Sequence, residues 1–238
     1  MKYVVSDTRT PDAALRGLRA LGFEPIALPC FSSLDAPVSA HPDMLLFLGD
    51  SLFFSDRYYS AAKEEIDLIS VAANLPLCPC KIEISSVYPN DVAFNVLKIG
   101  NFIFGKEASI APQIKEYAAE AALKIIDVKQ GYTKCSTCKV SENAIITSDR
   151  SIEKAAKNCG IDVLLISQGH VRLDGYDCGF IGGASGTDGE RVYFCGDISL
   201  HPDGEAIRDF CQKHKKEAVS LSDEPLYDIG TLFFFHSK

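Results

Sequence analysis

The sequence predicts an α/β fold made of about five diverged copies of one strand–helix–strand unit. Apolar segments of strand length alternate with amphipathic helical segments, similar segments recur at near-constant distances, and Tyr88, Tyr132 and Tyr176 follow one another at an even spacing of 44 residues. Similarity at a fixed period is the signature of a repeat architecture. We expect one domain, because 238 residues is an ordinary length for a single α/β domain. The approximate repeats are 1–40, 41–87, 88–131, 132–175 and 176–238.

Two neighbouring copies show the pattern most clearly. One copy is read as an extended segment 101–104, a helix 114–122 and a segment 124–132, and the next as an extended segment 143–146, a helix 152–159 and a segment 163–170; both last segments end near a Gln-Gly pair. In both helices apolar residues recur at i, i+3, i+4 and i+7, so one face of each helix packs on a sheet. Gly160 follows the second helix and ends it in the left-handed conformation.

The other copies are more diverged. Their predicted elements are strand 51–54, helix 61–73 and strand 80–84 in the second unit, strands 192–195 and 218–221 in the last, and strand 2–6 in a partial first unit. Asp203 is the expected N-cap of the helix between the last two strands, because Asp is a preferred N-cap residue. The first unit has a helix capped by Thr10 and stopped at Gly22.

One more short extended segment precedes the core of four units, at 44–48, 92–99, 137–140 and 179–184. The repeat is then ββαβ, and residues 230–235 return to complete the first copy. We therefore predict a five-fold pseudosymmetric β/α propeller. An open α/β sheet with helices on both faces is the alternative, since it shows the same alternation of strands and helices. The doubled strands favour the propeller.

The charge balance argues against some partners. With 24 Lys+Arg against 32 Asp+Glu, the net charge of −8 lacks the basic excess that a nucleic-acid-binding surface needs. No segment reaches the roughly 18 apolar residues of a membrane span. An acidic residue at Asp7 interrupts the first apolar segment too early for a signal peptide. We expect a cytoplasmic protein without nucleic-acid or membrane partners, for which a small-molecule ligand and a homo-oligomer stay open.

The nine cysteines are an odd count and lie in apolar surroundings, as in Tyr193-Phe194-Cys195. This distribution is typical of buried, reduced thiols and not of a secreted disulfide framework. The Cys135/Cys138 pair has CxxC spacing, but on a strand residues three apart face opposite sides, and no second ligand pair follows. The sequence therefore predicts no metal and no cofactor.

Five ββαβ-like units closed by a carboxyl-terminal strand resemble the pentein fold, the β/α propeller of arginine and agmatine deiminases, amidinotransferases and dimethylarginine hydrolases. The likeness covers nearly the whole chain and rests on architecture. Three stretches also resemble a bacterial family to which no activity is assigned: residues 131–136, 179–186 and 225–230. The first resemblance implies a cysteine-dependent hydrolase or transferase acting on a small guanidino or amide compound.

In a propeller the short first strands line the central channel, so a site is expected where the chain leads into them. Those segments are 41–43, 90–95, 134–136 and 177–178. His41 and Asp43 resemble the His-x-Asp pair of the deiminases, in which the His transfers protons and the acid holds a guanidinium. On a strand both side chains would face the same side. A turn is the competing interpretation, since the second His-Pro-Asp, which begins at His201, lies at a helix start.

Two cysteines are candidate nucleophiles. Cys135 follows Lys134, whose positive charge would favour the thiolate, and Ser136 is beside it. Cys178 lies at the start of the last unit, where the resemblance places the nucleophile of the deiminases. For both, packing as a small buried residue is the alternative.

Further contacts are expected around a glycine-rich segment in the last unit. Gly182 lies in a stretch without the Gly-Lys-Ser/Thr ending of a P-loop, so it indicates a bulge or tight hairpin, or a close approach of backbone to a small ligand. Asp174 and Tyr176 precede it and are either polar contacts to a ligand or turn residues.

Two functions follow from these residues. In the first, Cys135 or Cys178 attacks a small guanidino or amide compound, His41 transfers protons, and Asp43 and Asn95 orient a cationic group. In the second, a non-catalytic propeller binds a metabolite or a protein. The sequence departs from the deiminases, in which the His-x-Asp pair comes later along the chain, so the loss of a working site stays open.

Overall fold

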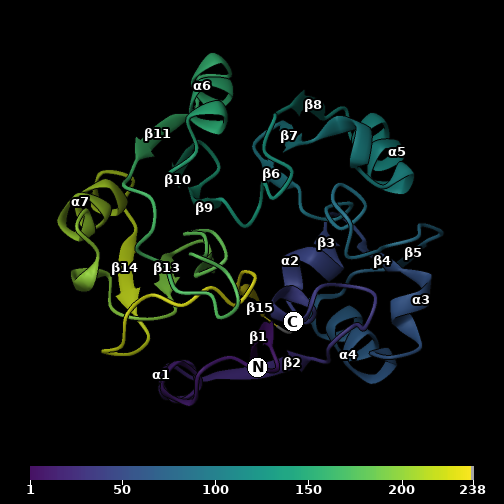
Figure 1. Cartoon of the computed structure of the whole chain (residues 1–238), viewed down its shortest axis with the longest axis horizontal. Coiled ribbons are helices and arrows are strands. Elements are labelled where there is room, and N and C mark those ends of the chain that lie inside the picture. Colours follow the sequence, from purple (N-terminus) through teal and green to yellow (C-terminus); the bar gives the residue numbers. More distant parts are fainter. Residues whose placement is uncertain (237–238) are drawn as a thin grey trace.

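Five small sheets stand in a ring around a common axis (Figure 1). The structure is a computed structural model that describes residues 1–236. Within these residues each sheet has three strands. The sheets are β1 Lys2–Asp7 with β2 Phe23–Leu28 and β15 Phe233–His236; β3 Leu46–Leu48, β4 Leu52–Ser55 and β5 Leu77–Cys80; β6 Leu97–Ile99, β7 Phe102–Gly105 and β8 Lys124–Asp127; β9 Thr137–Ser141, β10 Ala144–Thr147 and β11 Asp162–Leu165; and β12 Ser185–Thr187, β13 Arg191–Phe194 and β14 Glu217–Ser220. The predicted propeller is confirmed.

Every sheet has the same internal order. Its middle strand pairs antiparallel with the inner strand and parallel with the outer one. A parallel pair needs a crossover connection, and here the crossover contains a helix on the outside of the ring (Figure 1). The crossover helices are α1 Asp12–Ala20, α3 Asp56–Tyr59 with α4 Lys63–Ala73, α5 Pro112–Glu120, α6 Arg150–Asn158 and α7 Gly204–Lys213.

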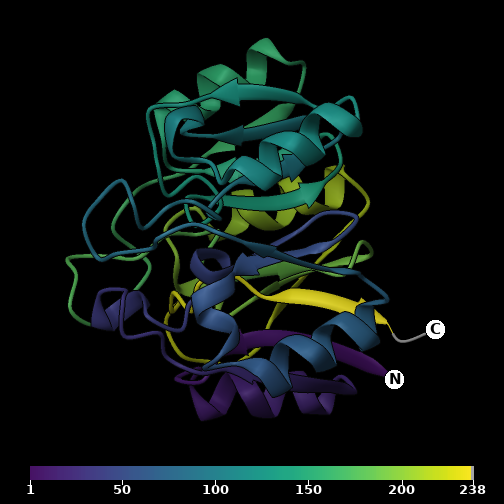
Figure 2. The same cartoon turned by 90° about the vertical axis from the view of Figure 1, so that its right-hand side faces the viewer.

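The carboxyl-terminal strand closes the ring. β15 pairs antiparallel with β1, from Lys2 opposite His236 to Val5 opposite Phe233. Phe234 packs against Tyr193 of the preceding sheet, with ring centroids 4.5 Å apart. The first and last described strands, β1 and β15, therefore lie side by side (Figure 2).

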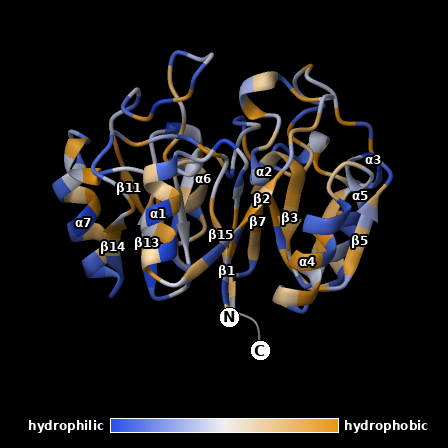
Figure 3. Cartoon of the chain, turned by 90° about the horizontal axis from the view of Figure 1, so that it is seen from below, coloured by the Kyte–Doolittle hydropathy of each residue, from blue (hydrophilic) through white to orange (hydrophobic). Residues whose placement is uncertain are grey.

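The core lies between neighbouring units. Ile152 and Ala156 of α6 are fully buried and pack with Leu97 and Phe104 of the preceding sheet. The outer faces of the helices carry hydrophilic residues, whereas the strands are largely hydrophobic (Figure 3). Each unit thus buries its apolar face on the next one, as stacked repeats do.

Three predicted inner strands differ from those observed. Residues 42–45 form a one-turn helix, α2 Pro42–Leu45, because Pro42 occupies the first helical position, which its fixed φ favours. The inner strand of that unit therefore starts only at Leu46, and the inner strand predicted at 92–99 covers only Leu97–Ile99. The strand predicted at 179–184 is wrong, because a turn spans 181–184 and β12 starts at Ser185.

Other elements were misplaced or missed. The prediction of a strand at 80–84 is wrong: β5 ends at Cys80 and includes Pro79, which an edge strand tolerates. β2 was not predicted. The Asp203 side chain does not cap α7; it accepts a hydrogen bond from the Ser167 amide at 2.6 Å. Thr10 does not cap α1 either, which begins at Asp12 after Pro11. Among residues 1–236, no helix has the length and apolarity needed to cross a membrane.

Candidate functional site

The segments that lead into the inner strands meet near the axis of the ring. His41 and Asp43 precede β3, Asn95 precedes β6, and Cys135 precedes β9. Of the four segments singled out in the sequence, three supply side chains to this group, and Cys178 is not among them. Thr231, in the equivalent position before β15, completes the group, because its hydroxyl donates to an Asp43 carboxylate oxygen at 2.7 Å.

Local backbone structure directs Asp43 to the axis. His41 is the N-cap of α2 with an extended backbone, and Pro42 starts the helical turn. The Asp43 amide donates to the Gly230 carbonyl at 2.9 Å, which ties this turn to the closing segment of the chain. The prediction that His41 and Asp43 lie on a strand is therefore wrong. Their side chains come together because both residues lie at the start of a helix.

The sulfur of Cys135 lies in a network of buried side chains. It is 3.0 Å from both carboxylate oxygens of Asp43, which places the thiol as donor and the carboxylate as acceptor. The Asn95 side-chain amide donates to the same sulfur at 3.1 Å. The side-chain oxygen of Asn95, Oδ1, accepts hydrogen bonds from the backbone amides of Lys134 and Cys135 at 2.8 and 3.2 Å. Asn95 thus fixes the turn that carries Cys135.

The resting state of Cys135 is the neutral thiol. Burial raises the pKa of this thiol well above its usual value, and the negative charge of Asp43 raises it further. The ammonium group of Lys134 donates to the Thr231 hydroxyl at 3.0 Å, and its effect on the Cys135 thiolate stays a prediction. Burial also lowers the pKa of Lys134, against the opposing effect of Asp43.

His41 lies between two buried carboxylates. Its Nε2 is 3.9 Å from an Asp7 oxygen and its Nδ1 is 3.8 Å from an Asp228 oxygen, and Nδ1 makes no hydrogen bond within residues 1–236. Asp7 is held bidentately by the guanidinium of Arg9, at 2.9 and 2.6 Å. Burial raises the pKa of Asp228, and the nearby His41 opposes this.

One ring nitrogen of His41, one oxygen of Asp43 and the sulfur of Cys135 lie within 4.8 Å of one another. These three residue types are common zinc ligands. A closed structural zinc site uses four protein ligands, whereas this group supplies three. Among residues 1–236 it is also the one set of three His, Cys, Asp or Glu side chains close enough to share an ion.

An acidic cavity opens beside His41. It has a volume of about 300 Å³, and the residues lining it are Asp7, Arg9, Pro37, His41, Leu173, Asp174, Tyr227, Asp228 and Ile229. Three carboxylates face one guanidinium, so the lining carries excess negative charge. A cavity of this kind suits a small cation.

The remaining predicted site residues divide between this region and the surface. Asp174 lines the cavity and is 3.8 Å from the guanidinium of Arg172. Tyr176 is 46% exposed and donates to Asp35 at 2.7 Å, away from Cys135. Cys178 is half-buried in the loop that precedes β12.

Two others lie next to Cys135 in the chain or in space. Ser136 is buried, and its hydroxyl has no partner within residues 1–236. Gly182 is packed so closely that an added Cβ would lie 2.5 Å from the Cys135 carbonyl oxygen, and its own carbonyl accepts from Thr231. Gly182 lies in the turn at 181–184, which fits the expected tight turn, and a close approach to a small ligand stays a prediction.

Sequence reasoning missed Asp7, Asp228 and Thr231. The last two belong to the segment before the closing strand, which is equivalent to the four segments that were searched. Had the same rule been applied to residues 225–232, both would have been found. Asp7 ends β1 and gave no separate signal.

Comparisons with known proteins agree with this architecture. The model of a family of unknown function (DUF6873) matches residues 5–233. The chain belongs to that family. No curated protein matches the sequence.

Solved structures of an amidinotransferase, of DDAH and of an agmatine deiminase have a similar fold. The chain is similar to SxtG, an amidinotransferase of the saxitoxin biosynthetic pathway from Microseira wollei, with a TM-score of 0.53, 13% identity, and coverage of 92% of this chain and 88% of that one. It is also similar to DDAH from Pseudomonas aeruginosa in complex with citrulline, with a TM-score of 0.53, 11% identity, and coverage of 93% of this chain and 92% of that one. A third similar structure is agmatine deiminase from C. jejuni, with a TM-score of 0.51, 8% identity, and coverage of 92% of this chain and 87% of that one. At these identities the likeness shows the fold, which is the pentein fold.

Proposed function

We propose that this family member is a cysteine-dependent hydrolase or transferase that acts on a small guanidino or amide compound. The observation that carries the proposal is the convergence of the Cys135 sulfur, a His41 ring nitrogen and the Asp43 carboxylate within 4.8 Å of one another. A nucleophile, a proton carrier and an orienting acid are the parts that covalent catalysis needs. The activities of the proteins with the same fold supply the substrate class.

The acidic cavity is the proposed place for the cationic group of the substrate. Asp7 already binds a guanidinium bidentately, that of Arg9, so the geometry of its carboxylate suits this group. Asp228 offers a second buried carboxylate whose oxygens accept the amides of Phe180 and Gly230. A cation near Asp228 would also stabilise its ionised form.

The proposed reaction starts when the substrate reaches Cys135. The thiol proton passes to His41, and the sulfur forms a bond to the central carbon of the guanidinium. The adduct then loses an amine as its C–N bond breaks, and His41 returns the proton to the leaving nitrogen. Displacement of the sulfur by water gives hydrolysis, and displacement by an acceptor amine gives transfer. The positive charge of the substrate offsets the negative charge of Asp43 and so favours the thiolate.

A labelling experiment tests this proposal. 2-Chloroacetamidine is cationic and 2-chloroacetamide is its neutral counterpart; both alkylate a thiol when the sulfur–carbon bond forms and chloride leaves. Peptide mass spectrometry at pH 7.5 would give the labelling rate of each cysteine. We expect the amidine to label Cys135 at least about tenfold faster than the amide, because the acidic lining concentrates the cation.

Controls come from the same chain. Exposed Cys30 gives the intrinsic ratio of the two reagents, and Asp228→Asn should reduce the preference at Cys135. If the ratio of the amidine rate to the amide rate were the same at Cys135 as at Cys30, the proposal would be contradicted. Screening of guanidino compounds for amine release, with Cys135→Ser as the matched variant, would then identify the substrate.

A non-catalytic binding protein is the second candidate. It is favoured by the burial of Cys135, which is 3% exposed and hydrogen-bonded to Asp43. In that case a guanidino compound would raise the melting temperature without any amine release, and Cys135→Ser would leave this shift intact. Loss of the shift in Cys135→Ser would count against it.

A further inference from the structure

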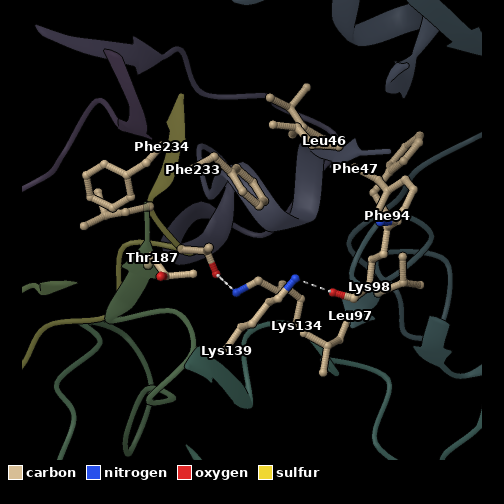
Figure 4. Close-up of a pocket in the computed structure, with 15 residues that line it drawn as sticks. Leu46, Phe47, Phe94, Leu97, Lys98, Lys134, Lys139, Thr187, Phe233 and Phe234 are labelled. Carbon is tan, nitrogen blue, oxygen red and sulfur yellow. Dashed lines mark hydrogen bonds between the residues drawn. The ribbon is translucent and has the colours of Figure 1, made fainter. Parts of the chain in front are cut away.

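The inner strands enclose a second cavity that the proposed reaction does not use. Its volume is about 210 Å³, and each of the five inner strands contributes to its lining. The residues drawn in Figure 4 include Leu46, Phe47, Lys98, Lys139, Thr187 and Phe233 from these strands. The cavity is therefore part of the central channel. Lys134 and Thr231 line it as well, whereas Asp43 and Cys135 do not.

The charged groups of this cavity are all positive. Lys98, Lys134 and Lys139 line it, and no Asp or Glu does. Lys139 is 21% exposed and has an acidic partner outside the lining, Glu142, at 2.6 Å. It also donates to the Lys98 carbonyl at 3.2 Å (Figure 4). The sign of the lining is opposite to that of the acidic cavity beside His41.

Lys134 has donors to spare. An ammonium group has three donors, and the one hydrogen bond of this group within residues 1–236 goes to the Thr231 hydroxyl, at 3.0 Å. No ion pair in the described part of the chain includes Lys134. The Asp43 carboxylate attracts this cation but forms no ion pair with it, and a cation withdrawn from water without a paired anion is costly, so an anion beside Lys134 would be stabilising.

Apart from Thr187 and Thr231, the other side chains of the lining are apolar. Aromatic side chains of Phe47, Phe94 and Phe233 surround the space next to the lysines (Figure 4). Inorganic anions gain nothing from such a surface, whereas an organic anion buries its carbon skeleton there. The volume is below the 300–1,000 Å³ of ordinary ligand pockets, which limits the ligand to a small molecule.

We propose that the lysine-lined cavity of the central channel binds a small organic carboxylate, with the carboxylate on Lys134 and the apolar part against Phe47, Phe94 and Phe233. Lys98 and Lys139 add positive charge at the rim. This site is separate from the acidic cavity, and the inference does not depend on any reaction at Cys135.

Isothermal titration calorimetry with three probes of one shape tests the charge preference. Benzoate carries the carboxylate, benzamide is its neutral isostere, and benzylamine carries the opposite charge. We expect benzoate to bind and the other two to bind at least about tenfold more weakly, a difference of about 1.4 kcal/mol. Equal affinity of benzamide, or no heat from benzoate up to 10 mM, would overturn the proposal. Tighter binding of inorganic phosphate than of benzoate would overturn the assignment to an organic anion.

Variants locate the site. Lys134→Met keeps the length of the side chain and removes the charge, so benzoate binding should fall at least about tenfold. Because Lys134 is half-buried, Lys98→Met serves as a second variant, with an expected loss of about threefold from a rim charge. Lys154→Met, on the exposed face of α6, is the matched control and should bind benzoate normally. Unchanged binding in both channel variants would refute the assignment.

Asp228→Asn separates this proposal from the proposed function. It removes a negative charge from the acidic cavity and should leave benzoate affinity unchanged, whereas a clear change, above all a gain from the lost repulsion, would place benzoate in the acidic cavity and overturn the inference.

Discussion

Asn95 is the residue whose removal should most clearly loosen the candidate site. Asn95→Ala deprives the buried Cys135 amide and the half-buried Lys134 amide of their shared acceptor, and it deletes the donor to the Cys135 sulfur. One unsatisfied buried amide costs about 1–3 kcal/mol, and a partly hydrated one costs less. With the small void left by the truncated side chain, the expected loss in the free energy of unfolding is about 3 kcal/mol. For a chain of this size that lowers the melting temperature by about 6–12 °C.

Urea unfolding followed by circular dichroism measures this loss, since the chain has no Trp for fluorescence. Asn158→Ala is the matched control, because Asn158 lies exposed in the last turn of α6, and it should change stability by only a few tenths of a kcal/mol. A loss below about 1 kcal/mol for Asn95→Ala, with the control unchanged, would refute the view that Asn95 holds the Cys135 turn in place.

Three more outcomes are expected. Thr231 has φ 75°, unusual for a β-branched residue, and its hydroxyl donates to Asp43 at 2.7 Å with the Gly182 carbonyl also in reach at 3.0 Å. Thr231→Ser should therefore stay near the parent stability while Thr231→Val loses about 2–4 kcal/mol in urea unfolding, and equal effects would contradict this. In Gly183→Ala the new Cβ would lie 1.9 Å from an Asp228 oxygen, so the melting temperature should fall far more than in Gly22→Ala, where only the left-handed backbone costs about 1 kcal/mol. Burial raises the pKa of Cys138 to about 11 and the pKa values of Cys80, Cys195 and Cys211 to about 12. These thiols therefore ionise at lower pH in the unfolded chain than in the folded one, so the urea midpoint should fall as the pH rises from 8 to 10. A midpoint that rises would contradict this prediction.

The fold could be predicted because its periodic signal is strong. Helices with apolar residues at helical spacing, such as α5 and α6, begin within two residues of their predicted positions. The failures occur where tertiary contacts override local pattern. Residues 179–184 are apolar and extended in appearance, but Gly182 and Gly183 pack against Lys134 and Asp228, which requires a turn. Edge strand β5 was misplaced because Pro79 within it and Pro76 before it look like breaks in the sequence.

The candidate site could be predicted only in part, for a geometric reason. The rule that a site forms ahead of the inner strands selects His41, Asp43, Asn95 and Cys135, which the structure brings together. The rule cannot give the protonation state of Cys135, because that depends on burial and on the distance to Asp43. The roles of these residues stay predictions until labelling and activity are measured.

Closure of the ring by β15 makes the starting point of the chain arbitrary. Since Lys2 pairs with His236, a short linker could join the two ends and new ends could be opened in a loop between units, giving a circular permutant with the same interior. The position of a catalytic residue is then a matter of cyclic order, in which His41 and Cys135 are separated by two units whichever residue is numbered first. A His-Pro-Asp segment early in the chain is consequently no obstacle to a working site.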